Sequence, residues 1–68
     1  MTPLERIRRE AGLTMMELAK KSGVSYLVIV KIEAGNIGSV TVRTLLRLSD
    51  ALSCDPRQLF DANNVHKM

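Results

Sequence analysis

Residues 13–35 read LTMMELAKKSGVSYLVIVKIEAG, and this stretch predicts two helices joined by a short turn. Thr14 precedes the first helix and Glu17 follows three residues later, which is the spacing of a capping box. Gly23 is placed to end this helix, and Ser25 is placed to cap the next one. A turn of about four residues makes two consecutive helices cross steeply.

Steep crossing places strict demands on the residues at the corner. Ala19 must be small because the second helix passes close to it. Gly23 must accept a left-handed backbone, in which a Cβ atom is poorly tolerated. Val24 is expected to fill the corner. The apolar residues expected to seat the two helices on the core are Leu18, Ile29 and Ile32.

A further helix is predicted before this segment. Thr2 is a suitable N-cap, and Pro3 occupies the first helical position. One apolar face is expected, and Gly12 is placed to close the helix. The residues of that face are Leu4, Ile7 and Ala11.

Two more helices are predicted after the segment. Thr41 caps the fourth, whose apolar residues recur at helical spacing. These residues are Val42, Leu45, Leu48 and Leu52, with Leu46 alongside. Asp55 and Pro56 begin a short fifth helix that ends near Phe60, and the polar tail 61–68 is expected to fray. The fold class is therefore all-α, with five helices in one domain over residues 1–68 and the two-helix motif at about 14–34.

Composition agrees with one small domain that has an anionic partner. The chain has 68 residues, of which 46% are hydrophobic, and its aromatic residues are Tyr26 and Phe60, so an aliphatic core is expected. The net charge of +3 and the pI near 9.5 favour nucleic acid or an acidic membrane surface as a partner.

Several function classes are excluded by what the sequence lacks. Cys54 is the single cysteine, so we expect no intramolecular disulfide and no cysteine-based metal site, and we expect a half-buried thiol. The apolar runs are too short for a membrane span and no signal peptide is visible, so we predict a cytoplasmic protein. No nucleophile–base set, paired carboxylates or Gly-rich phosphate loop is present, which predicts no enzyme activity and no cofactor or metal.

The combination of Ala19, Gly23, Val24 and Ile29 at these offsets resembles the Cro/C1-type (XRE-like) helix-turn-helix family of phage repressors and bacterial regulators. Similarity to this family extends over nearly the whole chain. The resemblance implies a five-helix, lambda-repressor-like DNA-binding domain. It also implies that the recognition helix, residues 25–34, enters the major groove while the preceding helix lies across the DNA backbone.

Carried over residue by residue, the resemblance gives a set of DNA-facing positions on the recognition helix. They are Ser25, Tyr26, Leu27, Val30 and Lys31. Lys31 could donate a hydrogen bond to guanine O6 or N7, and Leu27 and Val30 could contact thymine methyl groups. Hydrogen-bonding side chains are fewer here than the family's pattern leads us to expect.

Positions outside the recognition helix are also implied. Met15 stands where the family usually has a glutamine that braces the recognition helix and touches phosphate. Asn36 and Ser39 lie in the following loop, where small polar side chains often meet phosphate, with plain solvation as the alternative. Met15 could also serve in packing alone.

Charged residues of the first helix are expected to have structural roles. By default we expect Arg6, Arg8 and Arg9 to form a solvated face, from which one or two could reach phosphate. Glu33 is expected to pair with an arginine of the first helix.

Two functions are compatible with these residues. The first is a sequence-specific regulator of transcription, repressor-like, that binds double-stranded DNA and forms a weak homodimer, at least on DNA. The dimer interface would come from the fourth and fifth helices, the loop at Ser53 and Cys54, or the tail. The alternative is a protein-interaction module that keeps the fold and uses the apolar face of the third helix, Tyr26, Leu27 and Val30, for a protein partner.

Overall fold

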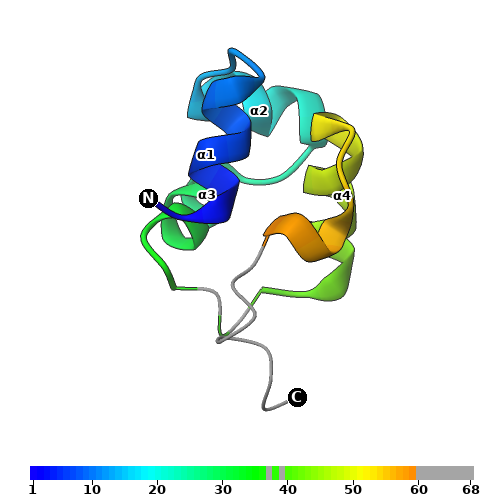
Figure 1. Cartoon of the computed structure of the whole chain (residues 1–68). Helices are drawn as coiled ribbons and strands as arrows, with labels where there is room; N and C mark the ends of the chain where they lie inside the picture. Colours follow the sequence, from blue (N-terminus) through cyan, green and yellow to red (C-terminus); the bar gives the residue numbers. More distant parts are fainter. Residues whose placement is uncertain (37, 39, 60–68) are drawn as a thin grey trace.

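Four α-helices and one 3-10 helix make up the computed structural model, which describes residues 1–36, 38 and 40–59 (Figure 1). The elements are α1 (Pro3–Glu10), α2 (Met15–Ser22), α3 (Tyr26–Glu33), α4 (Val42–Leu52) and the 3-10 helix η1 (Pro56–Leu59). The part of the chain that the structure describes contains no strand. The all-α fold class is therefore confirmed.

Three of the predicted N-caps are made by threonine hydroxyls. Thr2, Thr14 and Thr41 each accept a hydrogen bond from the backbone N–H three residues later. The Glu17 carboxylate also accepts from the Thr14 N–H at 2.8 Å, which completes the predicted capping box. Ser25 occupies the N-cap position of α3, but its side chain makes no capping hydrogen bond.

The core is aliphatic, as the composition predicts. α4 packs on α2 and η1, while α1 packs on α3 and η1, so apolar side chains from every element meet in one cluster. Its buried members are Leu4, Leu18, Val24, Ile29, Ile32, Leu48, Ala51 and Leu59. Full burial of a large aliphatic side chain stabilises the folded state by about 1.5–3 kcal/mol, so this cluster is the main source of stability.

Two residues predicted on apolar faces lie in solvent. Ala11 is exposed as the C-cap of α1, which ends at Glu10, and it lies about one turn past Arg8, the last buried residue of that helix. Val42 has 70% of its surface exposed. It is the first residue of α4, six positions before Leu48, which is the first buried residue of that helix.

The predicted fifth helix is a single 3-10 turn of four residues. Asp55 caps it through its carboxylate, which accepts from the Arg57 N–H at 2.8 Å. The Gln58 side chain returns to accept from the Asp55 N–H at 3.0 Å. These reciprocal bonds fix one tight turn and bury Leu59. Phe60 and the tail 61–68 lie outside the described residues.

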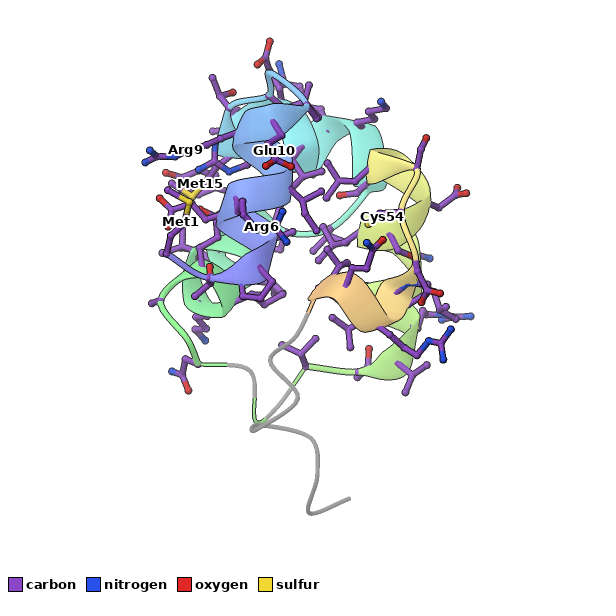
Figure 2. The ribbon with its side chains drawn as sticks, in the orientation of Figure 1. Met1, Arg6, Arg9, Glu10, Met15 and Cys54 are labelled. Atoms are coloured by element: carbon purple, nitrogen blue, oxygen red, sulfur yellow. The ribbon has the colours of Figure 1, made fainter. Side chains whose placement is uncertain are left out.

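Arg8 departs from the solvated arginine face that the sequence predicts. Its side chain is buried, and Nε and Nη2 donate to the Glu33 carboxylate at 2.6 and 3.0 Å. The prediction that Glu33 pairs with an arginine of the first helix is confirmed. Arg6 and Arg9 do lie on the outside of α1 (Figure 2), where each forms an ion pair with a glutamate of the same helix.

Candidate nucleic-acid interface

The turn between α2 and α3 is built by short-range hydrogen bonds. Gly23 adopts φ 74° and ψ 14°, the left-handed conformation, and its N–H donates to the Ala19 carbonyl at 2.9 Å. The Ser22 hydroxyl donates to the Leu18 carbonyl at 2.7 Å and accepts from the Val24 N–H at 3.2 Å. Val24 is buried in the corner, as predicted. These contacts fix the direction in which α3 leaves α2.

α3 has a buried face and an exposed face. Ile29 and Ile32 are buried and seat the helix on the core, as predicted. Four of the positions predicted to face DNA, Tyr26, Leu27, Val30 and Lys31, fall within roughly 140° of helical arc on the other side, and Ser25 precedes them as the N-cap. Ser25, Tyr26, Leu27 and Lys31 are exposed, and Val30 is half-buried. Leu27 is the most prominent apolar residue of this face, with 66% of its surface exposed.

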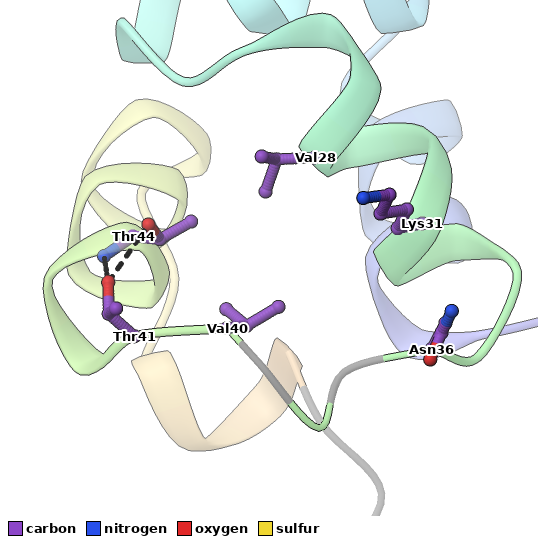
Figure 3. A pocket seen from close by; sticks show the side chains of 6 residues that line it. All are labelled: Val28, Lys31, Asn36, Val40, Thr41 and Thr44. Carbon is purple, nitrogen blue, oxygen red and sulfur yellow. Dashed lines mark hydrogen bonds between the residues drawn. The ribbon is translucent and has the colours of Figure 1, made fainter.

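A groove of about 260 Å³ runs between α3 and the start of α4 (Figure 3). Lys31 and Asn36 line it from one side, while Thr41 and Thr44 line it from the other (Figure 3). Its remaining lining residues are Val28 and Val40. The Thr41 and Thr44 hydroxyls are 3.0 Å apart and hydrogen-bonded. Thr41 is the donor in this bond, which leaves the Lys31 ammonium, the Asn36 amide and the Thr44 hydroxyl to donate to a phosphate oxygen.

Threonines at the start of α4 were missed as candidate site residues. The sequence marks Thr41 as an N-cap, and nothing in its local spacing shows that α4 begins beside Lys31. Ser39, predicted from the sequence as a phosphate contact, lies outside the described residues. Asn36 is exposed, and its N–H donates to the Lys31 carbonyl at 2.9 Å, which ties the loop to the end of α3.

Arg47 is a second residue that sequence reasoning missed. Its Nη1 atom lies 3.9 Å from where a Cβ would stand on Gly23, so the guanidinium of α4 covers the turn before the recognition helix. Within the described residues, neither Arg47 nor Lys31 has a carboxylate within 4.0 Å. Their charges are therefore available to an anionic ligand.

Met15 begins α2 and is half-buried against the core (Figure 2). Its neighbour Met16 is 51% exposed. A thioether is at most a weak hydrogen-bond acceptor, so Met15 cannot donate to phosphate. The structure therefore gives Met15 a packing role at the position where the resemblance implies a polar brace.

Cys54 lies between α4 and η1 and is half-buried, as predicted (Figure 2). Burial is the larger reason that the pKa of the Cys54 thiol is raised, and the nearby charge of Asp55 is the smaller one.

Among the residues that the structure describes, no group of three or more His, Cys, Asp or Glu side chains is placed to hold a metal ion. No helix in residues 1–36, 38 and 40–59 has the length and apolar character needed to cross a membrane.

Comparison with known proteins identifies the family. A family model described as helix-turn-helix matches residues 4–59, a range that runs from the second residue of α1 to the end of η1. The chain is also 30% identical over 63 residues to the glutamine–fructose-6-phosphate aminotransferase (isomerizing) of Methanocaldococcus jannaschii, a match that covers 93% of this chain and 6% of that protein. No solved structure matches the chain. The chain therefore belongs to the helix-turn-helix family, of the Cro/C1 (XRE-like) type that its turn residues indicate.

Proposed function

We propose that this protein binds specific sites in double-stranded DNA and regulates transcription in a repressor-like manner, with α3 in the major groove. The observation that supports the proposal is the direction of α3, which the Gly23 turn fixes. In this direction, one face of α3 is exposed to solvent. A rigid helix whose exposed side is free can enter a major groove about 12 Å wide.

Base recognition is assigned to the exposed face of α3. Lys31 donates to guanine O6 or N7, and Leu27 contacts a thymine methyl group. The Ser25 and Tyr26 hydroxyls are the other polar groups of this face. Val30 is half-buried and so contributes a smaller apolar contact. Such a surface discriminates partly through apolar contacts.

Phosphate binding is assigned to the rim of α3. Asn36, Thr41 and Thr44 surround the groove beside Lys31, and Arg47 covers the turn at the opposite end of the helix. Contacts to phosphate fix the register of the protein on the duplex without reading its sequence. Phosphate donors at both ends of α3 would hold that helix in the groove.

The functional unit on DNA is proposed to be a weak homodimer. One short helix touches few base pairs, and each correct pair adds only about 1–3 kcal/mol of discrimination. Two copies double the number of contacts and match a palindrome with half-sites about one helical turn apart. We expect no enzyme activity, and we expect the protein in the cytoplasm, where this function needs it.

Selection from a random duplex library, followed by binding titrations at several salt concentrations, tests the function. We expect an enriched palindromic motif. If each protomer neutralises four to six phosphates, log K should fall against log salt with a slope of about 4 to 5 per protomer. A library that yields no motif, with no duplex bound at low salt, would contradict the proposal. That result would favour a protein partner for Tyr26 and Leu27.

A further inference from the structure

The outer face of α4 combines exposed apolar and exposed charged residues. The buried side of α4 packs on α2 and η1. On the outer side, Val42 and Leu46 have 70% and 50% of their surfaces exposed. A shallow hollow of about 540 Å³ on this side is lined by Arg43, Leu46, Arg47 and Asp50. This side of α4 therefore presents an exposed leucine among charged side chains.

The charges on this face are arranged symmetrically about its centre. Arg43 and Asp50 are seven residues apart, which places them on the same side of the helix and about 10.5 Å apart along its axis. Leu46 lies between them, while the guanidinium of Arg47, which also lines the hollow, extends away from this centre to the Gly23 turn. Within the part of the chain that the structure describes, neither Arg43 nor Asp50 has an ion-pair partner within 4.0 Å.

This arrangement is self-complementary. A second α4 that runs antiparallel, about a two-fold axis close to Leu46, brings Arg43 of each copy opposite Asp50 of the other. The same axis brings the two Leu46 side chains together at the centre. Such an interface is isologous, because one patch is used by both copies. Opposite charges at its two ends specify the antiparallel register.

We propose that the outer face of α4, defined by Arg43, Leu46 and Asp50, is the homodimer interface of this protein. This inference adds a defined surface to the homodimer of the proposed function, on which it rests. The face of an eleven-residue helix is smaller than the roughly 800 Å² per partner of stable specific complexes, so the dimer is weak. Tyr26, Leu27 and Lys31 lie on α3, outside the interface, and stay open in the dimer.

Charge reversal tests the pairing in the full chain without DNA. Arg43→Asp places two carboxylates opposite each other at both ends of the interface, and Asp50→Arg places two cations there. We expect each variant alone to associate at least about 10-fold more weakly than the wild type, because like charges then face each other. An equimolar mixture of the two variants should associate like the wild type, since both ends of the heterodimer then carry opposite charges.

The variants are chosen so that folding is preserved. Arg43 lies in the first turn of α4 and Asp50 in its last, so both reversals complement the helix dipole. Arg6→Asp is the matched control, because Arg6 is an exposed arginine on α1, away from this face. We expect it to associate like the wild type. Circular dichroism of every variant verifies the fold, and sedimentation equilibrium at low salt measures the association.

Three results would overturn the inference. They are a wild type that stays monomeric at every concentration, single variants that associate like the wild type, and a mixture that associates no better than its components. The proposed function is judged separately, by binding of wild-type protein to duplex DNA. A wild type that stays monomeric in solution but binds duplex DNA rejects this interface alone, and a wild type that dimerises without any DNA binding rejects the proposed function alone.

Discussion

Arg8 of α1 and Glu33 of α3 form a bidentate ion pair in which the two side chains are only 9% and 8% exposed. The third donor of Arg8, Nη1, reaches the Leu13 carbonyl at 2.8 Å, so one guanidinium joins α1, the loop before α2 and the end of α3. The Thr2 hydroxyl also donates to the Glu33 carbonyl at 3.2 Å. These contacts fix the orientation of the recognition helix α3 relative to the first helix α1.

Removal of Arg8 should destabilise the domain strongly. The hydrogen bond with Glu33 is the main reason that the pKa of Arg8 is raised, and Arg8→Ala would leave the Glu33 carboxylate buried without a partner. Loss of one partner of a buried pair typically costs about 3–5 kcal/mol. Urea denaturation followed by circular dichroism measures the loss. Arg6→Ala is the control, with an expected change within about 0.5 kcal/mol, because Arg6 is exposed.

The double variant Arg8→Met/Glu33→Leu separates the ion pair from the packing around it. It should be more stable than Arg8→Ala, since no charge is left buried. If Arg8→Ala costs no more than Arg6→Ala, Arg8 has no structural role at this junction.

Gly23→Val should destabilise the fold by more than about 1 kcal/mol, because a β-branched residue is poorly tolerated at positive φ. The nearest atom to a Cβ on Gly23 is 3.9 Å away, an ordinary contact, so the backbone and not the available space sets the cost. Gly38→Val is the control, since Gly38 has no positive φ and no atom within 4 Å of an added Cβ. Equal melting temperatures for the two variants would contradict this explanation of the turn.

Local features of the fold could be predicted because short-range interactions decide them. The Thr14–Glu17 capping box and the left-handed Gly23 depend on neighbours within one turn, and the burial of Ile29 and Ile32 follows their helical spacing. Their residue types and spacings are therefore visible in the sequence. The same reasoning could not separate a fifth α-helix from the 3-10 turn at η1, since both begin with Asp55 and Pro56.

Features that depend on distant partners could not be predicted to the same extent. Arg8 is buried because Glu33, 25 positions along the chain, meets it across α1 and α3. The sequence indicated such a pair without specifying which arginine forms it. The groove beside Lys31 depends on how α4 sits against α3, which brings Thr41 into the candidate site although it appears in the sequence only as a cap.

Cys54 should react slowly with alkylating reagents. Its raised pKa leaves less thiolate at a given pH than an ordinary cysteine has, and the thiolate is the nucleophile. We expect iodoacetamide at pH 8 to modify the folded protein more slowly than free cysteine. Urea-unfolded protein is the control and should react at nearly the rate of free cysteine. Equal rates for folded and unfolded protein would contradict the burial of this thiol.

The Glu17 carboxylate should contribute to the loss of stability in acid. Hydrogen bonds from Thr14 lower its pKa below the ordinary value of 4.5. The stabilisation is therefore present above the unfolded pKa and is lost as pH falls through the folded pKa. In thermal melts from pH 6 to pH 2, Glu17→Gln should show a smaller decrease in melting temperature than the wild type. Parallel curves for the two proteins would contradict the prediction.

Lys31→Ala should weaken binding to the selected DNA site more than binding to random duplex. A lysine that donates to guanine O6 or N7 contributes about 1–3 kcal/mol of discrimination, and this contribution is absent on DNA that lacks the guanine. Fluorescence anisotropy on both duplexes at fixed salt measures the difference.

Lys20→Ala is the control, because Lys20 is an exposed lysine on α2 and its replacement makes the same change in net charge. It should weaken both duplexes equally or neither. Equal losses for Lys31→Ala on the two duplexes, with a salt slope reduced by about one, would make Lys31 a phosphate contact, because such contacts release counterions on any sequence. Unchanged affinity on both would exclude Lys31 from the interface and leave base recognition to the apolar residues of α3.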